Sequence, residues 1–333
     1  MISPKQAPFV HLGILALAAA SAAFVWTRDK DLPALSRGDV TVWGGRPAEV
    51  ESLRFESKTR KVELTAKDDA VGHYFEGTVE RDNVPPPHKG DAGAPPPSDL
   101  GKTTLTVVSV SAAESVAAAF APLKALRALG KVGDDRAAEY GLDSPEATVF
   151  VKLGGGEKKL FLGSATPGGG DRYVREAASG EVFVLKGESL RSLESAESMM
   201  MERELHDFKD PQIQRAKVSA GDRSRELVRG GPEGKRFWAD AKTPETNDET
   251  LGNWMSKLER LKPTEYLATA PPGLAPILRI DYSGGKAQGF LELAKAPGDK
   301  PTFLIKTERT RLYAKVPNPA AEQLEQDLGT MVK

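Results

Sequence analysis

A glycine-rich segment followed by charged and aromatic residues is a part of the sequence that could bind a ligand. It reads "SATPGGGDRYV", from Ser164 to Val174. Consecutive glycines leave main-chain N–H groups accessible to an anion, and Arg172 adds a positive charge beside them. Tyr173 and Arg175 follow on an expected strand. Arg172, Tyr173 and Arg175 are therefore candidates for an interaction surface, although a plain loop followed by a solvated strand face is the simpler interpretation.

Other residue types that commonly carry chemistry lack the spacing that a catalytic or metal site needs. The histidines, His11, His73, His88 and His206, occur in unrelated contexts without a pattern such as HExxH. The methionines at 199–201 fall on an expected helix, where methionine commonly fills gaps in a core. No GxSxG stretch occurs, and the acidic residues form no distinctive pair. We therefore expect no catalytic residue, no metal and no cofactor, and the protein is not predicted to be an enzyme.

The composition predicts two folded units with no preference for nucleic acid. The chain has 333 residues, more than the ~250–300 at which a single core usually stops growing. Lys and Arg number 46 against 47 Asp and Glu, so the formal charge is −1. Such a balance gives no strong field that would attract a polyanion, so no nucleic-acid partner is expected. Cysteine is absent, which excludes disulfides and thiolate chemistry.

An apolar segment near the amino terminus has the length of a membrane-spanning helix. Residues 7–27, "APFVHLGILALAAASAAFVWT", contain no Asp, Glu, Lys or Arg, and a helix of about 20 apolar residues crosses a bilayer. We expect residues 1–30 to form a membrane anchor, with a cleaved signal peptide as the alternative because small residues at 18–22 offer cleavage patterns. The basic residues after the segment favour a cytosolic domain by the positive-inside rule, but long domains translocate largely regardless of flanking charge.

Downstream of this segment, the hydrophobic pattern predicts an antiparallel sheet accompanied by helices. Alternating apolar residues from Val50 indicate a hairpin and a third strand, and apolar residues at steps of three or four indicate a helix over Ser111–Leu129. Pro122 inside that pattern predicts either a kink or a break with a fresh start after it. Four more strands and a closing helix that runs to Phe208 complete the first unit.

The same order of elements returns in the second part of the chain. The segment "KRFWAD" matches "GHYFEG", with Trp238 in the place of Tyr74. These two residues lie 164 positions apart, whereas Glu114 and Glu249 lie 135 apart. The first copy therefore has 29 extra residues between Gly77 and Glu114. The extra residues include the proline-rich segment 82–102, which we expect to form an extended surface loop because prolines and glycines interrupt strands and helices.

The predicted fold is therefore α+β: an N-terminal transmembrane helix followed by two tandem duplicated units of antiparallel sheet plus helices. The anchor is assigned to residues 1–30. The first unit is assigned to residues 31–210, with the proline-rich insertion at 82–102, and the second unit to residues 211–333. A duplication of this size also predicts two-fold pseudosymmetry.

Part of the chain has the sequence character of a known family. The segments are "LGKVGDDRAAEYGLDSPEATVFVKL", "LFLGSATPGGGDRYVRE" and "EVFVLKGESLRSLESAE". They resemble the bacterial domain-of-unknown-function family 4340, most specifically over residues 139–196 and more loosely over 213–332. The resemblance implies an N-terminal membrane helix and one or two α+β units outside the cytoplasm. It also implies an accessory role beside a transporter, because genes of this family commonly neighbour those of gliding-motility-type ABC transporters.

Together these features predict a membrane-anchored, extracytoplasmic, non-catalytic accessory or scaffold subunit of an ABC-transporter-type, gliding-motility-like complex. The expected partners are the membrane, through residues 7–27, and an ABC transporter permease or auxiliary membrane subunit. The expected location is the bacterial inner membrane, as a single-pass protein with the bulk of the chain in the periplasm. The alternative is an extracytoplasmic binding module for polysaccharide or another cell-envelope ligand, on which exposed Tyr173, Trp238 and Trp254 would stack.

Overall fold

The structure, a computed structural model, describes residues 39–83, 101–232, 234–285 and 287–332. The expected membrane anchor at 1–30 and most of the expected loop at 82–102 lie outside these ranges. Among the helices that are described, none combines the length and the apolar character required to cross a bilayer. The described residues form a mixed α and β fold in which strands predominate.

The strands fall into two halves along the chain. Those of the first half are β1 (Val40–Trp43), β2 (Val50–Ser57), β3 (Arg60–Asp68), β4 (His73–Asp82), β5 (Lys102–Ser109), β6 (Leu123–Ala125), β7 (Arg127–Gly130), β8 (Ala147–Leu153), β9 (Gly156–Ala165), β10 (Asp171–Glu176) and β11 (Val182–Lys186). Those of the second half are β12 (Arg215–Ala220), β13 (Arg223–Gly230), β14 (Phe237–Asp240), β15 (Glu265–Tyr266), β16 (Ala275–Gly284), β17 (Ala287–Ala296), β18 (Thr302–Thr307) and β19 (Ala314–Lys315).

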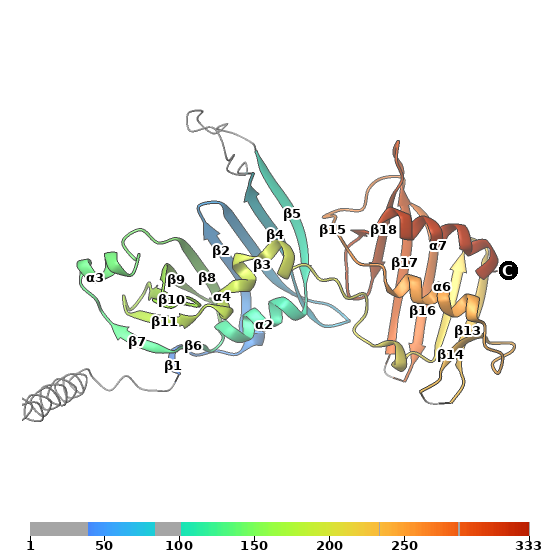
Figure 1. The fold of residues 1–333 in the computed structure, drawn as a ribbon, viewed down its shortest axis with the longest axis horizontal. Helices are drawn as coiled ribbons and strands as arrows, with labels where there is room; N and C mark the ends of the chain where they lie inside the picture. The colour runs from blue at the N-terminus through green and yellow to red at the C-terminus, as the bar shows by residue number, and fades with distance from the viewer. Residues whose placement is uncertain (1–38, 84–100, 233, 286, 333) are drawn as a thin grey trace, which may run out of the picture.

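Helices follow the strands at corresponding points of the two halves. They are α2 (Ser111–Phe120), α3 (Asp134–Glu139), α4 (Glu188–Glu194), α5 (Ala196–Met199), α6 (Glu249–Glu259) and α7 (Asn318–Met331), with short 3-10 turns at Pro47–Glu49 and Asp210–Gln212. Figure 1 shows α6 and α7 lying together on one face of the second sheet, and α2 and α4 lying beside the first.

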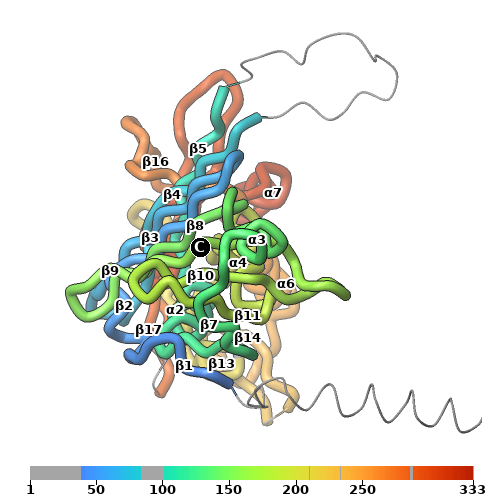
Figure 2. Tube along the Cα trace, turned by 90° about the vertical axis from the view of Figure 1, so that its left-hand side faces the viewer, coloured from blue at the N-terminus to red at the C-terminus, as the bar shows by residue number. Residues whose placement is uncertain are grey.

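The spatial order of the strands is the same in both halves. In the first half it is β7, β11, β10, β9, β8, β2, β3 and β4. In the second half it is β15, β19, β18, β17, β16, β12, β13 and β14. Every pairing is antiparallel, and Figure 2, which looks at the first half from its end, shows β2, β3, β4 and β8 side by side. These eight strands of each half therefore share one topology, whereas β1, β5 and β6 of the first half have no counterpart among the described strands of the second.

Strand β5 joins the two sheets. It pairs with β4 along its full length, and its Thr106 is the register partner of Tyr266 in β15 of the second half. The second half places a turn where the first half places β5, so this strand belongs to the extra residues of the first copy. The insertion in the first copy thus supplies the strand that connects the sheets (Figure 1).

Each half has its own hydrophobic core, and the chain crosses from one core to the other between two adjacent methionines. Met200 is fully buried in the first core, and Met201 packs in the second. Leu205 also belongs to the second core, although it precedes the predicted division at residues 210 and 211. The predicted closing helix that runs to Phe208 is wrong, because α5 ends at Met199 and the next residues form a linker between the cores.

The second core also uses residues of the first half. Tyr74, Val108 and Val110 pack in it, whereas their neighbours Phe75 and Val107 pack in the first core. Because successive side chains of a strand point to opposite faces, β4 and β5 contribute to both cores at once. The second half is therefore not complete without these residues.

The predicted helix over Ser111–Leu129 is shorter in the structure. Helix α2 ends at Phe120, just before Pro122, which has no N–H group to continue the helical hydrogen bonds. The residues after it form β6 and β7, so the predicted break is confirmed, but strands follow it instead of a fresh start of the helix.

Val107 and Val108 provide a test of this shared strand. Both are fully buried, so replacing either by alanine should lower the free energy of unfolding by about 1–3 kcal/mol through lost burial and a residual cavity. We expect Val107→Ala to reduce amide hydrogen-exchange protection mainly in β2, β3 and β8, and Val108→Ala to reduce it mainly in β16, β17 and α6. Loss of protection in the same half for both variants would show that β5 does not serve two cores.

Candidate functional site

The predicted residues on β10 are engaged with neighbouring side chains of the first half. The guanidinium of Arg172 is 2.5 Å from Glu146 Oε2 and 2.8 Å from Glu194 Oε1, and its side chain is 23% exposed. Tyr173 stacks on Tyr140 with ring centroids 4.2 Å apart. These contacts are typical of a sheet surface held by its own side chains.

Arg175 also has an intramolecular partner, although it lies on another face of the strand. Its guanidinium carbon is 5.2 Å from the ring centroid of Phe161 on β9, which is within the range of a cation–π interaction. Arg172 and Arg175 are three positions apart on β10, so the alternation of side chains along the strand places them on opposite faces. Arg172, Tyr173 and Arg175 lie on one strand but do not converge on a cavity among the described residues.

The prediction that Trp238 and Trp254 are exposed is wrong. Each is only 2% exposed, and both belong to the core of the second half. Trp254 lies on the inner side of α6, where its indole N–H donates a hydrogen bond of 3.2 Å to the carbonyl of Leu324. Neither indole can stack on a ligand in this structure, so only Tyr173 remains partly exposed among the three aromatic residues named for that role.

The strand registers give the physical reason for the burial of Trp238. Leu64 and Leu227 occupy equivalent places in the two sheets, and counting from their partners on the next strand aligns Trp238 with Phe75. The predicted alignment with Tyr74 is therefore shifted by one residue. Phe75 is fully buried in the core of the first half, and Trp238 is buried at the equivalent place in the core of the second half.

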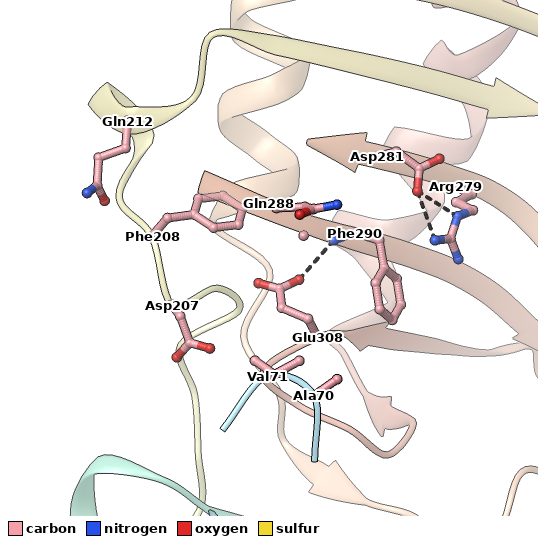
Figure 3. Close-up of a pocket in the computed structure, with 11 residues that line it drawn as sticks. Ala70, Val71, Asp207, Phe208, Gln212, Arg279, Asp281, Gln288, Phe290 and Glu308 are labelled. Carbon is pink, nitrogen blue, oxygen red and sulfur yellow. Dashed lines mark hydrogen bonds and ion pairs between the residues drawn. The ribbon is translucent and has the colours of Figure 1, made fainter. Parts of the chain in front are cut away.

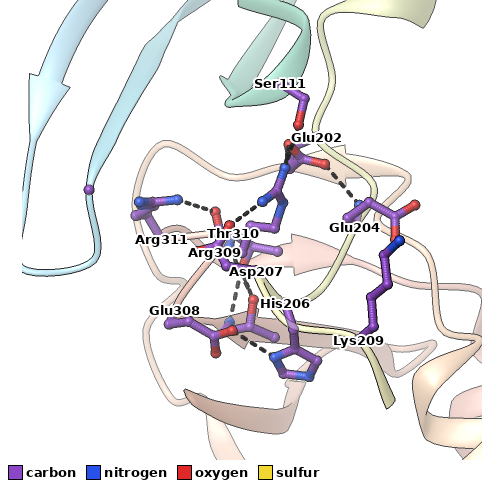
Figure 4. A network of polar contacts seen from close by, with 12 residues as sticks. Ser111, Glu202, Glu204, His206, Asp207, Lys209, Glu308, Arg309, Thr310 and Arg311 are labelled. Atoms are coloured by element: carbon purple, nitrogen blue, oxygen red, sulfur yellow. Dashed lines mark hydrogen bonds and ion pairs between the residues drawn. The ribbon is translucent and has the colours of Figure 1, made fainter. Parts of the chain in front are cut away.

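The most elaborate polar arrangement lies where the two halves meet. We call it the junction clamp; it consists of the turn Glu308–Arg311 between β18 and β19 and the side chains that this turn holds. Those side chains come from the β3–β4 turn, the start of α2 and the linker, and they are Asp69, Ser111, Glu202, His206 and Asp207. Figure 4 shows the turn entering the space between the linker and the first half.

Arg309 is the centre of the clamp. Its guanidinium donates to Ser111 Oγ at 2.7 Å and to Glu202 Oε2 at 3.0 Å, and it forms an ion pair with Asp207. The side chains of Arg309 and Glu202 are only 10% and 6% exposed. Burial alone would lower the pKa of Arg309, but the carboxylates of Glu202 and Asp207 raise it, so the group is held firmly in its charged form.

Glu202 is fixed by its own main-chain contacts as well. Its other carboxylate oxygen accepts from the N–H groups of Arg203 and Glu204 at 3.0 and 2.9 Å. Its N–H donates to the carbonyl of Val108 on β5, and its carbonyl accepts from the hydroxyl of Tyr266 on β15. The linker residue that receives Arg309 is therefore bonded to both halves.

Arg311 adds a second arm to the clamp. Its Nε atom is 3.0 Å from Asp69 Oδ2, and its guanidinium carbon is 4.4 Å from the ring centroid of Tyr74. Arg311 has a φ of +56°, a left-handed conformation that costs a non-glycine residue roughly 1–2 kcal/mol. Gly180 occupies the equivalent turn position of the first half, with a φ of +71° and the same hydrogen bond back to the preceding strand. An arginine at this position is explained by its contacts across the junction, which offset that cost.

His206 and Glu308 form a buried pair within the clamp. His206 Nδ1 lies 2.8 Å from Glu308 Oε1, and the side chains are 8% and 6% exposed. The other oxygen of Glu308 accepts from the N–H of Phe290 at 2.9 Å, at the point where β18 no longer pairs with β17. A Cβ at Gly289 would lie 2.5 Å from Cδ of Glu308, so only glycine permits this approach.

A groove runs along the junction next to the clamp. Its volume is about 630 Å³, within the range of ligand pockets. Val71 of the β3–β4 turn lines one side, Asp207 and Phe208 of the linker line the base, and Arg279 and Phe290 line the other side (Figure 3). The charged groups are already paired, Arg279 with Asp281 and Glu292 and Asp207 with Arg309, so the groove has no concentrated charge.

The clamp holds the two halves of the chain together through paired side chains. Its carboxylates accept hydrogen bonds from arginines and main-chain N–H groups, so their oxygen atoms are already occupied. No group of three His, Cys, Asp or Glu side chains in the described ranges is arranged to hold a metal ion. The main interaction in the clamp is the ion pairing of Arg309 with Glu202 and Asp207.

The sequence analysis did not identify any residue of the clamp as a candidate site. One signal was present in the sequence, a difference between the two copies at one turn. The turn "ERTR" at Glu308–Arg311 stands where the first copy has "AASG" at 177–180. Two arginines and a glutamate in place of two alanines and a glycine at an equivalent turn indicate a role that only the second copy has. Identifying the partners required the structure, because they lie more than 100 residues away along the chain.

Comparison with known proteins identifies one family. Residues 108–276, just over half of the chain, match the family model described as Domain of unknown function (DUF4340). The matched segment begins in β5 and ends in β16, so it runs through the linker and includes Ser111, Glu202 and His206. A search of curated proteins found no match, and a search of solved structures found none either.

Removing the guanidinium of Arg309 should destabilise the protein strongly. Arg309→Met leaves the carboxylate of Glu202 buried without its charged partner, and breaking a buried pair in this way costs about 3–5 kcal/mol in the free energy of unfolding. The double variant Arg309→Met with Glu202→Gln should recover part of that loss, because it removes the uncompensated charge. Denaturant titration followed by circular dichroism measures both effects. Equal losses for the single and double variants would contradict the pairing, and Arg46→Ala, at an exposed ion pair, serves as the control.

Acid should release the Arg311 arm of the clamp. Burial would raise the pKa of Asp69, but hydrogen bonds from Arg311 and from the N–H groups of Gly72 and Val71 outweigh it and lower the pKa. A lowered pKa in the folded state means that the contribution of Asp69 to stability is present above its ordinary pKa of about 3.9 and is lost as the pH falls through the lowered value. The stability difference between wild type and Asp69→Asn should therefore shrink between about pH 5 and about pH 2. A difference that does not depend on pH would contradict the ion pair.

Proposed function

The chain belongs to the family described as a domain of unknown function (DUF4340), and on that premise we propose that it is a membrane-anchored, extracytoplasmic, non-catalytic accessory or scaffold subunit of an ABC-transporter-type, gliding-motility-like complex. The partner in this proposal is an ABC transporter permease or auxiliary membrane subunit. The neighbourhood of such transporter genes, implied by the sequence resemblance, supports this choice of partner.

The single observation that carries the scaffold role is the junction clamp. Two units that merely followed one another on a chain would behave as independent modules joined by a linker. Here Arg309 and Arg311 fix the linker and the first half to the second sheet, while β5 continues the sheet from β4 to β15. A rigid, extended body is what a subunit needs in order to hold a partner at a fixed distance and orientation from the membrane.

The location in this proposal rests on the amino-terminal segment. Residues 7–27 have the length and apolar character of a membrane-spanning helix, and we place the bulk of the chain in the periplasm of a bacterial cell, anchored in the inner membrane. The orientation follows the tendency of long domains to translocate largely regardless of flanking charge.

We further propose that the two halves arose by tandem duplication. The shared strand order supports this origin, because each strand from β2 to β4 and from β7 to β11 has a counterpart in the second half. In this account the β5 insertion and the charged turn at Glu308–Arg311 are additions that converted two similar units into one body.

Affinity purification from native membranes tests the proposal. The full-length protein, tagged after Lys333 and solubilised gently, should bring down an ABC permease and its ATPase above an untagged control, as measured by mass spectrometry. A matched chain that begins at Asp31 and lacks the apolar segment should remain in the soluble fraction. Recovery of the full-length protein alone in several detergents would contradict a stable subunit.

The clamp variant extends the same experiment. Arg309→Met should reduce recovery of the partner relative to Arg46→Ala at equal expression, because the rigid arrangement of the halves is lost while each surface remains. Full recovery of the partner with the clamp broken would show that rigidity is not what the complex requires.

A further inference from the structure

A row of alternating cationic and aromatic side chains crosses the first sheet on the face away from its core. Its members are Arg54 on β2, Phe150 on β8, Lys159 and Phe161 on β9, and Arg175 on β10. Arg54, Phe150 and Lys159 are register partners across three strands, and Phe161 pairs in the same way with Arg175. We call these five residues the cation row.

The side chains of the cation row are partly exposed, whereas their neighbours along each strand are buried. Phe161 lies between Leu160 and Leu162, which are 0% and 1% exposed, and Phe150 likewise lies between two fully buried valines. Because successive side chains of a strand point to opposite faces, the two phenylalanines lie on the outer face of the sheet. Neither ring belongs to the core that the first sheet forms with α2 and α4.

The two rings hold the cations in place without neutralising them. The guanidinium carbon of Arg54 is 3.8 Å from the ring centroid of Phe150. Lys159 Nζ is 5.1 Å from that centroid and 4.6 Å from the centroid of Phe161, and Arg175 lies over Phe161 from the other side of the row. All these distances are within the range of cation–π interactions, in which the cation keeps its charge.

The Lys159–Arg175 end of the row has unpaired positive charge. Within the part of the chain that the structure describes, the charged groups of Lys159 and Arg175 contact aromatic rings and form no ion pair. At the other end, the guanidinium of Arg54 is 3.6 Å from Glu56 and 3.8 Å from Glu157, so its charge is partly balanced. The free charge is therefore concentrated around Phe161.

The second sheet shows that the fold does not require this pattern. The strand registers place Asp281 at the position equivalent to Phe150, and Glu292 at the position equivalent to Phe161. Both carboxylates pair with Arg279. The second copy thus neutralises its outer face with carboxylates, whereas the first copy has phenylalanines there and leaves cations without partners.

This difference between the copies points to an anionic ligand of the first sheet. The five positions of the cation row carry three cations and no carboxylate, whereas the equivalent positions of the second sheet carry two cations and two carboxylates; those equivalents are Lys217, Asp281, Phe290, Glu292 and Lys306. A partly exposed aromatic ring where a carboxylate is tolerated gains nothing from water. The surface complements a ligand that has both negative charges and apolar faces.

An acidic polysaccharide has this combination of groups. Neighbouring strands lie ~4.8 Å apart, so the row from β2 to β10 spans about 14 Å, a length suited to an extended chain rather than to a single ion. Carboxylates form strong hydrogen bonds with guanidinium and ammonium groups, and the C–H faces of sugar rings are apolar. An acidic protein segment fits less well, because a strand joins a sheet through main-chain hydrogen bonds at its edge and the row lies on the face.

We propose that the cation row binds an acidic polysaccharide, a chain of sugar rings that carry carboxylates, with the carboxylates on Lys159 and Arg175 and a sugar ring against Phe161. The chain as a whole has balanced charge, so the row acts at short range, within the Debye length of about 8 Å at physiological ionic strength. The proposal does not depend on the scaffold role, since it concerns a ligand of the first sheet rather than a membrane partner.

Calorimetric titration of the full-length protein with three small probes tests the ligand class. The protein is held in an uncharged detergent without sugar head groups and is titrated with trigalacturonic acid, with neutral maltotriose and with tri-L-glutamate. We expect trigalacturonate to bind with a Kd of about 0.1–1 mM, a weak affinity because the ligand is small, and to bind at least about tenfold more tightly than the other two. Raising NaCl from about 50 mM to about 500 mM should weaken that binding.

Two outcomes of this titration would overturn the proposal. Absence of trigalacturonate binding at saturating concentration would remove the site. Equal affinity for tri-L-glutamate would show that the row recognises negative charge alone and would exclude selectivity for a polysaccharide.

A pair of equivalent variants assigns the binding to the first sheet. Arg175→Gln should weaken trigalacturonate binding by about tenfold, because it removes one charged hydrogen-bond donor. Lys306→Gln is the matched control, since Lys306 occupies the equivalent register position of the second sheet, and it should leave the Kd unchanged. Equal effects of the two variants would overturn the assignment to the cation row.

Phe161→Glu gives the first sheet the residue that the second sheet has at this position. The new carboxylate would lie between Lys159 and Arg175 and pair with them, so binding of trigalacturonate should fall by at least about tenfold. The melting temperature without ligand should be unchanged or higher, because the fold already accommodates glutamate at the equivalent Glu292. A folded Phe161→Glu variant that binds as tightly as wild type would contradict the site.

Discussion

The ion pair between Arg309 and Glu202 is the interaction on which the arrangement of this protein depends. Both groups are almost fully buried, so each would be costly to place there alone. Together with Ser111 and Asp207 they satisfy one another, and the planar guanidinium binds several acceptors in fixed directions. Such a pair is a poor source of net stability but a strong source of geometric specificity, because a displaced linker would leave a buried charge without its partner. The shared strand β5 and the second core's use of Tyr74, Val108 and Val110 presuppose this fixed geometry.

Much of the fold followed from the hydrophobic pattern. Strands such as β8, with alternating buried residues, and α6, with apolar residues at steps of three and four, appear where the periodicity places them. The extra length of the first copy was correctly located, but its consequence was not, because pairing between β5 and β15 depends on a neighbour that is remote in sequence. The misplacement of Trp238 had a simple cause. Matching aromatic letters allowed a shift of one residue, so Trp238 was aligned with Tyr74 instead of Phe75.

The site was harder to predict than the fold for a physical reason. Charged residues are common on surfaces, and nothing local distinguishes Arg309, which is buried among carboxylates, from Arg175, which lies over Phe161 on the surface of a sheet. Distinguishing them requires knowing which segments meet in space. Comparison of the two copies comes closest to identifying the site from sequence. Arg311 occupies a left-handed position at which the other copy has Gly180. In a duplicated chain, function should be sought at positions where one copy replaces a residue that suits the backbone conformation with one that is energetically less favourable there.

The distance between the halves in solution tests the clamp most directly. The chain has no cysteine, so spin labels can be attached at cysteines introduced for Glu157 on β9 and Glu322 on α7, both exposed. Pulsed electron paramagnetic resonance then measures the distribution of distances between the labels. A rigid junction predicts one narrow distribution that broadens in the Arg309→Met variant. A broad distribution in the wild-type protein, or one that is equally narrow with and without Arg309, would contradict the view that this ion pair holds the two halves as one body.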